Sequence, residues 1–124
     1  EFRRFVLLSG PPGTELQWLQ SVDDSGLAFI VMDPRQVVAG YRVELSPHEL
    51  AELAVNDVGE LDVYTLVVVP RDRRQMRTNL KAPILINSRQ RLAKQAVLDK
   101  SEYPIRYYLS AAADSEVSHA RSHP

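Results

Sequence analysis

Three histidines and one pair of adjacent aspartates come closest, in type and spacing, to a catalytic or metal-binding arrangement. His119 and His123 are four residues apart, a spacing that would suit a metal ion on one face of a helix. The sequence around them is small and polar and indicates a flexible tail, so we expect no metal there. His48 falls in a predicted helix, where a solvated position is usual. Asp23 and Asp24 lie in a turn signal, whereas catalytic carboxylates need a cleft.

The signals for a nucleophile or a phosphate site are equally incomplete. Residues 10–14 (Gly-Pro-Pro-Gly-Thr) superficially suggest a phosphate loop, but they lack the lysine, and the two prolines have no amide hydrogen to donate. Ser9 and Ser46 lack the sequence context of an activated hydroxyl. The chain has no cysteine, which excludes disulfides, thiolate nucleophiles and cysteine-based zinc sites. The sequence therefore predicts a protein that is not an enzyme and needs no cofactor.

A cluster of arginines suggests binding chemistry instead. Arg71, Arg73, Arg74 and Arg77 could contact RNA phosphates. Unpaired bases could then stack on three tyrosines that follow: Tyr103, Tyr107 and Tyr108. The cluster can also be a solvated loop interrupted by Asp72, because it is short and contains no aromatic residue. Direct RNA binding therefore remains an alternative function.

The bulk composition is ordinary for a globular protein. The chain has 124 residues, of which 44% are hydrophobic and 25% charged, and its formal net charge is −1. This balance favours neither nucleic acid nor membrane surfaces, and no apolar run approaches the roughly 20 residues that span a bilayer. No signal-peptide pattern opens the chain. We therefore expect a cytoplasmic protein that does not associate with membranes.

The charges are unevenly divided along the chain. Residues 1–64 contain 11 acidic and 4 basic side chains, whereas residues 65–124 contain 5 acidic and 11 basic ones. Acidic strands can pair with basic strands within one domain. Alternatively, one face is acidic and another basic, so that a charged partner docks in one orientation.

Strand signals separated by turn residues recur along most of the chain. Runs rich in β-branched and aromatic residues predict strands at residues 2–9, 16–20, 27–32, 41–45, 61–69, 79–87, 94–98 and 103–108. Residues 27–32 are apolar throughout, which is typical of a central strand buried on both faces. The chain starts directly in a strand, so we expect further strands of the natural protein before Phe2.

One helix is well signalled after residue 45. Ser46 can cap it, Pro47 suits its first position, and Glu49 completes a capping box. Its apolar stripe is predicted at three positions: Leu50, Leu53 and Ala54. Many strands with one short helix predict an all-β fold, an antiparallel sandwich or small barrel-like domain over residues 1–109, followed by a flexible tail at 110–124.

Specific polar residues flank the apolar runs between residues 79 and 98, where no catalytic group is evident. These residues are Asn79, Lys81, Asn87, Lys94 and Gln95. Such a pattern favours a surface that recognises a partner. The same side chains can instead cap strand ends.

The order of these segments resembles the FliW family of flagellar assembly factors. The resemblance covers residues 2–109 and is strongest over residues 79–87, at Lys94 and Gln95, and over residues 103–106. Further matches are residues 16–21, 27–34, Tyr41, Leu45 and residues 69–70.

The resemblance implies a non-enzymatic protein that binds the RNA-binding regulator CsrA and flagellin. Free flagellin would compete with CsrA, so that export of flagellin frees the protein to sequester CsrA and relieves repression of flagellin translation. A CsrA-type protein presents a basic surface to RNA. We therefore expect acidic residues of the first half of this chain to contact it: Asp23, Asp24, Asp33 and Glu44.

Overall fold

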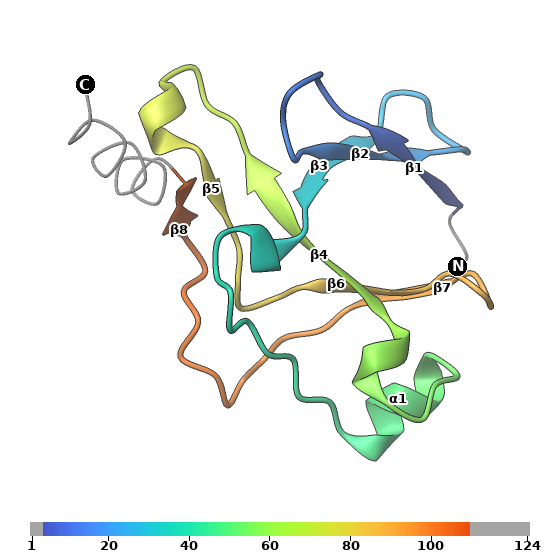
Figure 1. Cartoon of the computed structure of the whole chain (residues 1–124). Helices are drawn as coiled ribbons and strands as arrows, with labels where there is room; N and C mark the ends of the chain where they lie inside the picture. Colours follow the sequence, from blue (N-terminus) through green and yellow to red (C-terminus); the bar gives the residue numbers. More distant parts are fainter. Residues whose placement is uncertain (1–3, 110–124) are drawn as a thin grey trace.

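A computed structural model describes residues 4–109, and Figure 1 shows the course of the chain. Eight strands form the sheet: β1 (Phe5–Ser9), β2 (Gln17–Ser21), β3 (Ala28–Met32), β4 (Asp62–Val68), β5 (Arg77–Thr78), β6 (Ile84–Asn87), β7 (Leu92–Gln95) and β8 (Tyr107–Tyr108). One α-helix, α1 (Pro47–Glu52), and three single turns of 3-10 helix complete the described part: Pro34–Gln36, Val58–Glu60 and Arg73–Gln75.

Strand β4 joins the two halves of the sheet. Its first residues pair with β6, and its last residues pair with β3 on one side and β5 on the other. Strands β2 and β1 continue from β3, β8 continues from β5, and β7 continues from β6. Every pairing is antiparallel, and the sheet does not close into a barrel (Figure 1). The predicted all-β antiparallel fold with one short helix is confirmed.

The main core lies between the β4–β6–β7 region and the chain around α1. Leu53, Leu80 and Leu85 are almost completely buried there, at exposed fractions of 1%, 1% and 0%. Truncating one such leucine to alanine typically costs about 2–5 kcal/mol of stability. A smaller cluster of Met32, Val67 and Leu109 lies near β3, β4 and the end of the described chain.

Helix α1 begins as the sequence predicts. The Ser46 hydroxyl accepts a hydrogen bond from the Glu49 amide, and the Glu49 carboxylate accepts one from the Ser46 amide. The helix is shorter than expected, because it ends at Glu52. Leu53 is buried, but Ala54 is exposed and has φ of 56°, so its place in the apolar stripe was wrong.

Two strand predictions are wrong: one segment is not a strand, and the other contains a shorter strand than expected. Residues 41–45 alternate between buried and exposed side chains as an edge strand would, yet they pair with no other strand. Of residues 103–108, the strand β8 includes only the last two. Alternation reports which side chains face the core. It does not report whether another segment of the protein lies close enough to form backbone hydrogen bonds.

The strand at residues 27–32 is present as β3, but it is not buried on both faces. Val31 and Met32 are buried beside β4, whereas Ala28 and Phe29 are exposed. Burial decreases along this strand because its first half extends beyond the core with β1 and β2. The expected flexible tail at residues 110–124 lies outside the described residues.

The loop between β1 and β2 requires glycine at its first position. The Gly10 amide donates to the Leu16 carbonyl at 3.1 Å, and a Cβ atom on Gly10 would lie 2.2 Å from that oxygen. Residues 10–14 thus form a turn between two strands, as expected, and its closure leaves no space for a side chain at Gly10.

Substituting Gly10→Ala should destabilise this hairpin by about 1–3 kcal/mol, because the backbone of the loop must shift to relieve the contact. Thermal unfolding and amide exchange in β1 would measure the effect. Gly40→Ala is the matched control, since a Cβ atom there meets nothing within 4 Å. Equal stability of the two variants would contradict the prediction.

Candidate protein-binding surfaces

Strands β1, β2 and β3 carry a row of apolar side chains that is exposed on β1 and β2 and packs against the smaller core cluster at Ile30. The register places Leu8 opposite Trp18 and Trp18 opposite Ile30, so the three side chains form a row across the strands. Leu8 is 48% exposed, and Val6, two residues before it on the same face, is 43% exposed. A row of this kind favours contact with another apolar surface.

The opposite face of the same three strands is also apolar. Leu7 lies opposite Leu19, and Leu19 lies opposite Phe29. The Phe5 and Phe29 rings are 6.3 Å apart between centroids. Both faces of this part of the sheet are therefore suited to binding an amphipathic segment.

Strand β1 forms an edge of the sheet. Among residues 4–109 it pairs with β2 alone, so its outer side has no neighbouring strand (Figure 1). Exposed backbone groups at such an edge can accept an added strand from another polypeptide.

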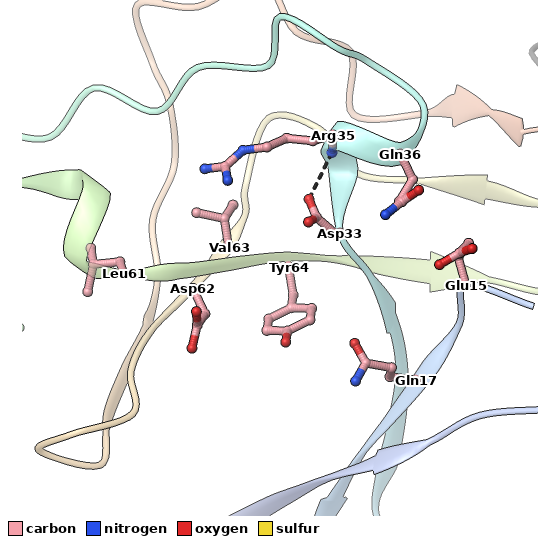
Figure 2. Close-up of a pocket in the computed structure, with 9 residues that line it drawn as sticks. All are labelled: Glu15, Gln17, Asp33, Arg35, Gln36, Leu61, Asp62, Val63 and Tyr64. Atoms are coloured by element: carbon pink, nitrogen blue, oxygen red, sulfur yellow. Dashed lines mark hydrogen bonds between the residues drawn. The ribbon is translucent and has the colours of Figure 1, made fainter.

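An acidic pocket of about 250 Å³ lies between β2, β4 and the 3-10 turn after β3 (Figure 2). Three carboxylates line it: Glu15, Asp33 and Asp62. Arg35 also lines the pocket, and its backbone amide donates to Asp33 Oδ1 at 2.9 Å. The excess of negative charge suits a basic side chain of a partner.

Tyr64 lines the same pocket from β4 (Figure 2). Its pKa is raised above the ordinary value, mainly because the ring is partly buried, and further because Asp62 and Asp33 are close. The hydroxyl therefore stays protonated at physiological pH and remains a hydrogen-bond donor. The pocket thus offers acceptors for a cation and one neutral donor beside them.

The four acidic residues expected to contact a partner do not form one cluster. Asp33 lies in the acidic pocket, whereas Glu44 lies on the extended chain before α1. Asp23 forms a two-pronged ion pair with Arg4, at 2.7 and 3.2 Å. Asp24 accepts a hydrogen bond from the Gly26 amide and shapes the β2–β3 turn.

Three of the polar residues expected on a recognition surface hold the chain between β5 and β7. Asn79 Oδ1 accepts hydrogen bonds from the Lys81 and Ala82 amides. Lys81 Nζ donates to the Ser101 carbonyl at 2.9 Å, and Gln95 Nε2 donates to the Ala82 carbonyl at 3.1 Å. These side chains fix loop positions within the molecule.

Asn87 is buried at the end of β6. Its Nδ2 donates to the Leu53 carbonyl at 2.7 Å, and its Oδ1 accepts from the amides of Arg89 and Gln90. One amide side chain thus satisfies the end of α1 and starts the turn between β6 and β7. At 3% exposure it offers almost no surface to a partner.

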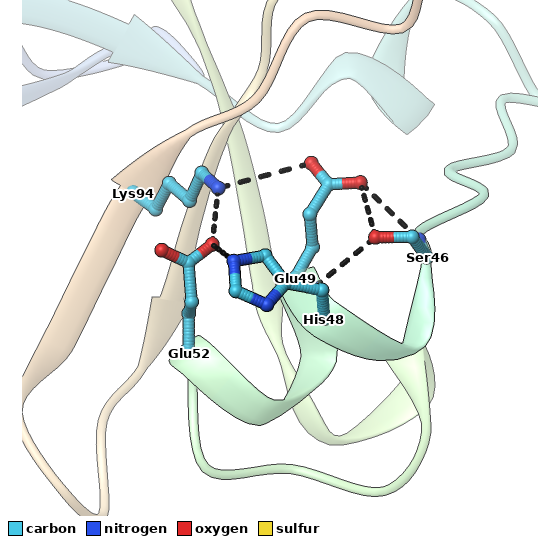
Figure 3. Close-up of polar contacts among 5 residues, drawn as sticks. All are labelled: Ser46, His48, Glu49, Glu52 and Lys94. Carbon is cyan, nitrogen blue, oxygen red and sulfur yellow. Dashed lines mark hydrogen bonds and ion pairs between the residues drawn. The ribbon is translucent and has the colours of Figure 1, made fainter.

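Lys94 joins β7 to helix α1 (Figure 3). Its Nζ lies 2.6 Å from Glu52 Oε1 and 3.9 Å from Glu49 Oε2, and His48 Nε2 lies 3.8 Å from Glu52. The hydrogen bond with Lys94 lowers the pKa of Glu52, and the same bond raises the pKa of Lys94. The charged forms of both groups are therefore favoured in the folded protein.

Lys94→Met should lower the melting temperature slightly at neutral pH, and this difference should shrink in acid. The lowered pKa of Glu52 stabilises the fold above the ordinary value of 4.5 and ceases to do so as Glu52 becomes protonated. The raised pKa of Lys94 likewise stabilises the fold below its ordinary value of 10.5. Thermal unfolding of both proteins across the acid range measures the effect.

Lys81→Met is the control for this pH series, because the Lys81 ammonium group donates to a carbonyl, which does not titrate. A melting-temperature difference for Lys94→Met that is unchanged between neutral and strongly acidic solution would contradict the assignment.

The arginine cluster partly meets the tyrosines expected beside it. Arg77 lies directly opposite Tyr108 in the β5–β8 pair, and Tyr108 is exposed. Arg74 pairs with Asp72 at 3.1 Å, which lowers the pKa of that aspartate. Tyr103 lies elsewhere, since its hydroxyl accepts a hydrogen bond from the Arg42 amide.

Sequence reasoning missed two features of these surfaces. Glu15, Asp62 and Tyr64 join Asp33 only because β2 and β4 flank the turn after β3. The alternation of Asp62, Val63 and Tyr64 was a usable signal, since it sets two polar groups on the outer face of a strand. The exposure of β1 to β3 had no such signal, because an apolar run indicates burial.

Within residues 4–109, no three His, Asp or Glu side chains are arranged to hold a metal ion. The candidate pair His119 and His123 lies outside the described residues. None of the helices in this part of the chain has the length and apolar character needed to cross a membrane.

Comparisons with known proteins agree on one family. The family model described as FliW protein matches residues 1–109. A flagellar assembly factor FliW of Caldicellulosiruptor saccharolyticus is 38% identical over 115 residues, which are 93% of this chain and 75% of that protein. The FliW of Geobacter sulfurreducens is 36% identical over 121 residues, covering 97% of this chain and 76% of its own length. A crystal structure of the flagellar assembly factor FliW superimposes with a TM-score of 0.76 at 30% identity, over 85% of this chain and 73% of that one.

Proposed function

This chain belongs to the FliW family of flagellar assembly factors, which are not enzymes, and we propose that it binds two proteins in turn, the translational regulator CsrA and flagellin. Binding of CsrA would relieve its repression of flagellin translation. No covalent step is involved, and the proposed site of action is the cytoplasm, where translation occurs.

The exposed sheet formed by β1, β2 and β3 is the observation that carries the flagellin half of the proposal. Both of its faces are apolar, and its outer edge is free among the described residues. The terminal segments of flagellin are amphipathic, so their apolar sides would bury side chains such as Leu8 and Trp18. Full burial of one such side chain contributes about 1.5–3 kcal/mol.

The acidic pocket supports the CsrA half. A basic side chain from the RNA-binding surface of CsrA would find three carboxylates, Glu15, Asp33 and Asp62, with the protonated Tyr64 hydroxyl beside them. Glu44, Asp23 and Asp24 would add long-range attraction from other parts of the acidic half. Electrostatic attraction of this kind mainly accelerates association.

Strand β2 connects the two proposed surfaces. Gln17 lines the acidic pocket, and Leu19, on the same face of β2, lies in the apolar row with Leu7 and Phe29. A partner that covers this row and a partner that fills the pocket would meet on one face of the strand and exclude each other sterically. This proximity supports a switch by mass action, in which the more abundant free partner occupies the protein.

The five polar residues between positions 79 and 98 take a different part in the proposal. Asn79, Lys81, Asn87, Lys94 and Gln95 make internal hydrogen bonds, so we propose that they affect partner binding by fixing the loops between β5 and β7.

A competition experiment tests the proposal directly. CsrA immobilised on a resin should retain the protein, and added flagellin should release it in proportion to the flagellin concentration. Retention of a ternary complex at saturating flagellin would contradict mutual exclusion. Failure to bind either protein would refute the proposed function.

Two single substitutions should separate the surfaces. Leu8→Glu places a charge in the apolar row and should weaken flagellin binding by about tenfold or more while leaving CsrA binding largely intact. Asp33→Lys should slow CsrA association several-fold, and the rate should lose part of its salt dependence. Calorimetry and surface plasmon resonance provide the two measurements.

Each of these variants is a control for the other partner. A further control, Ser88→Lys with Gln90→Lys, makes the same change in net charge as Asp33→Lys but on the exposed β6–β7 turn. If this control slowed CsrA association as much as Asp33→Lys, the acidic pocket would not be the contact.

Direct RNA binding is the second candidate, because Arg77 and the exposed Tyr108 lie side by side in the β5–β8 pair. Gel mobility of a structured RNA with this protein alone distinguishes the two functions. A mobility shift that decreases steeply as the salt concentration rises, and that Arg77→Gln abolishes, would favour the RNA-binding alternative.

A further inference from the structure

A second groove lies next to helix α1, on a part of the surface that the proposed function does not use. It has a volume of about 640 Å³ and runs between residues 42–46 and residues 97–103. The second segment turns at Asp99 and Lys100, where the Ser101 amide donates to the Leu98 carbonyl at 3.0 Å. Figure 1 draws both segments without strand arrows, the first in teal and the second in orange. The groove therefore lies between two segments that belong to no strand.

One wall of this groove has a free backbone edge. The Ala96 amide donates to the Pro83 carbonyl at 3.0 Å, and the Leu98 amide donates to the Lys81 carbonyl at 2.8 Å. In extended chain, successive residues direct their backbone groups to opposite sides. The amide and carbonyl of Val97 therefore point away from residues 81–83, and nothing within residues 4–109 hydrogen-bonds to them.

The opposite wall has the same property. Residues 41–45 are extended and alternate between buried and exposed side chains, yet they belong to no strand pair. In the described part of the chain, the amides of Val43, Glu44 and Leu45 have no hydrogen-bond partner. Only at one end does a bond cross between the walls, from the Arg42 amide to the Tyr103 hydroxyl at 2.8 Å.

The side chains of the groove indicate which segment would fit between these walls. Four acidic residues line it, against two basic ones: Glu44, Glu49, Asp99 and Glu102, against Arg42 and Lys100. Arg42 lies 3.8 Å from Glu44, and Lys94 lies 3.9 Å from Glu49, so these charges partly offset each other. Asp99 and Glu102 remain without an ion pair among the described residues. Leu45, Val97 and Leu98 supply apolar surface, and Val97 is 58% exposed.

We propose that this groove binds an extended, lysine- or arginine-rich segment of a partner protein, which adds as a strand along the backbone of Val97. Its amides and carbonyls complete the free edge, its aliphatic side chains contact Leu45 and Val97, and its cations lie beside Asp99 and Glu102. The inference goes beyond the proposed function, because it requires an extended cationic segment and holds whether or not CsrA or flagellin provides it.

The test is an NMR titration of the whole protein with the peptide acetyl-Lys-Val-Lys-Val-Lys-amide. Amide signals of Val97, Asp99 and Glu44 should shift, and their hydrogen exchange should slow as they become bonded or covered. Two peptides are controls. Acetyl-Glu-Val-Glu-Val-Glu-amide reverses the charge, and acetyl-Lys-Pro-Lys-Pro-Lys-amide keeps the charge but lacks alternate amide donors.

Both control peptides should bind at least several-fold more weakly. Equal binding of the proline peptide would overturn strand addition, and equal binding of the acidic peptide would overturn the charge assignment. Shifts confined to β1, β2 or β3 would show that the peptide binds a different surface and would also overturn the proposal.

A protein variant provides an independent check. Glu102→Lys should weaken binding of the Lys-Val peptide about fivefold. The double variant Ser88→Lys, Gln90→Lys makes the same change in net charge and should leave the affinity for this peptide unchanged. The spectrum itself shows whether each variant is folded. An affinity unaffected by Glu102→Lys would contradict the proposal.

Two other occupants would appear in the same spectra. Concentration-dependent shifts around Val97 without peptide would identify a second copy of the chain. Shifts there on deletion of residues 110–124 would identify the chain's own end. Either result would contradict the proposal, because a second copy or the chain's own end would then occupy the groove in place of a partner segment. If the protein bound neither CsrA nor flagellin but still gave the expected peptide titration, the proposed function would be refuted and the groove proposal would stand.

Discussion

The pairing of β4 with three other strands is the constraint on which the rest of the structure depends. Its first three residues pair with β6 and the following ones with β3 and β5, so one seven-residue strand connects both halves of the sheet. Thr65 and Thr78 are fully buried where these pairs meet. The Thr78 hydroxyl lies 2.6 Å from the Leu66 carbonyl and 2.7 Å from the Thr65 hydroxyl, so both buried hydroxyls have a hydrogen-bond partner.

This arrangement explains why the molecule has two unlike ends. The half of the sheet beside β6 and β7 packs against α1 and contains the larger core, fixed by the Asn87 side chain and the Lys94 ion pairs. The half beyond β3 extends from β4 with little to cover it, so burial decreases towards β1. Because β3 is attached to β4, strands β1 and β2 stay ordered although their apolar side chains face water. An isolated two-stranded hairpin is only marginally stable in water.

The proposed binding surfaces follow from the same geometry. The acidic pocket exists because β2, β4 and the turn after β3 bring together carboxylates that are far apart in sequence. The groove beside α1 exists because residues 42–46 and 97–103 face each other without strand pairing between them. The pocket gathers negative charge and the groove leaves backbone groups of Val97 without a partner among the described residues, and both are features that a second polypeptide would complete under the proposals above.

Sequence alone determined the elements whose stability is local. The capping box of Ser46 and Glu49, the turn at residues 10–14 and the β-branched run of β4 each depend on neighbours within a few residues, and each is present. The all-β class followed from the number of such runs, and the order of segments was enough to indicate the family.

Tertiary structure alone decided which of these elements are paired, covered or left open. Residues 41–45 have the alternation of a strand but no partner, and β3 has the composition of a buried strand but one exposed end. Asn87 could have been a surface contact or a buried cap, and only the position of the Leu53 carbonyl decided between them. The physical reason is the same in each case: hydrogen bonding and burial are satisfied by residues distant in sequence, and a pattern along the chain does not specify which distant residues arrive.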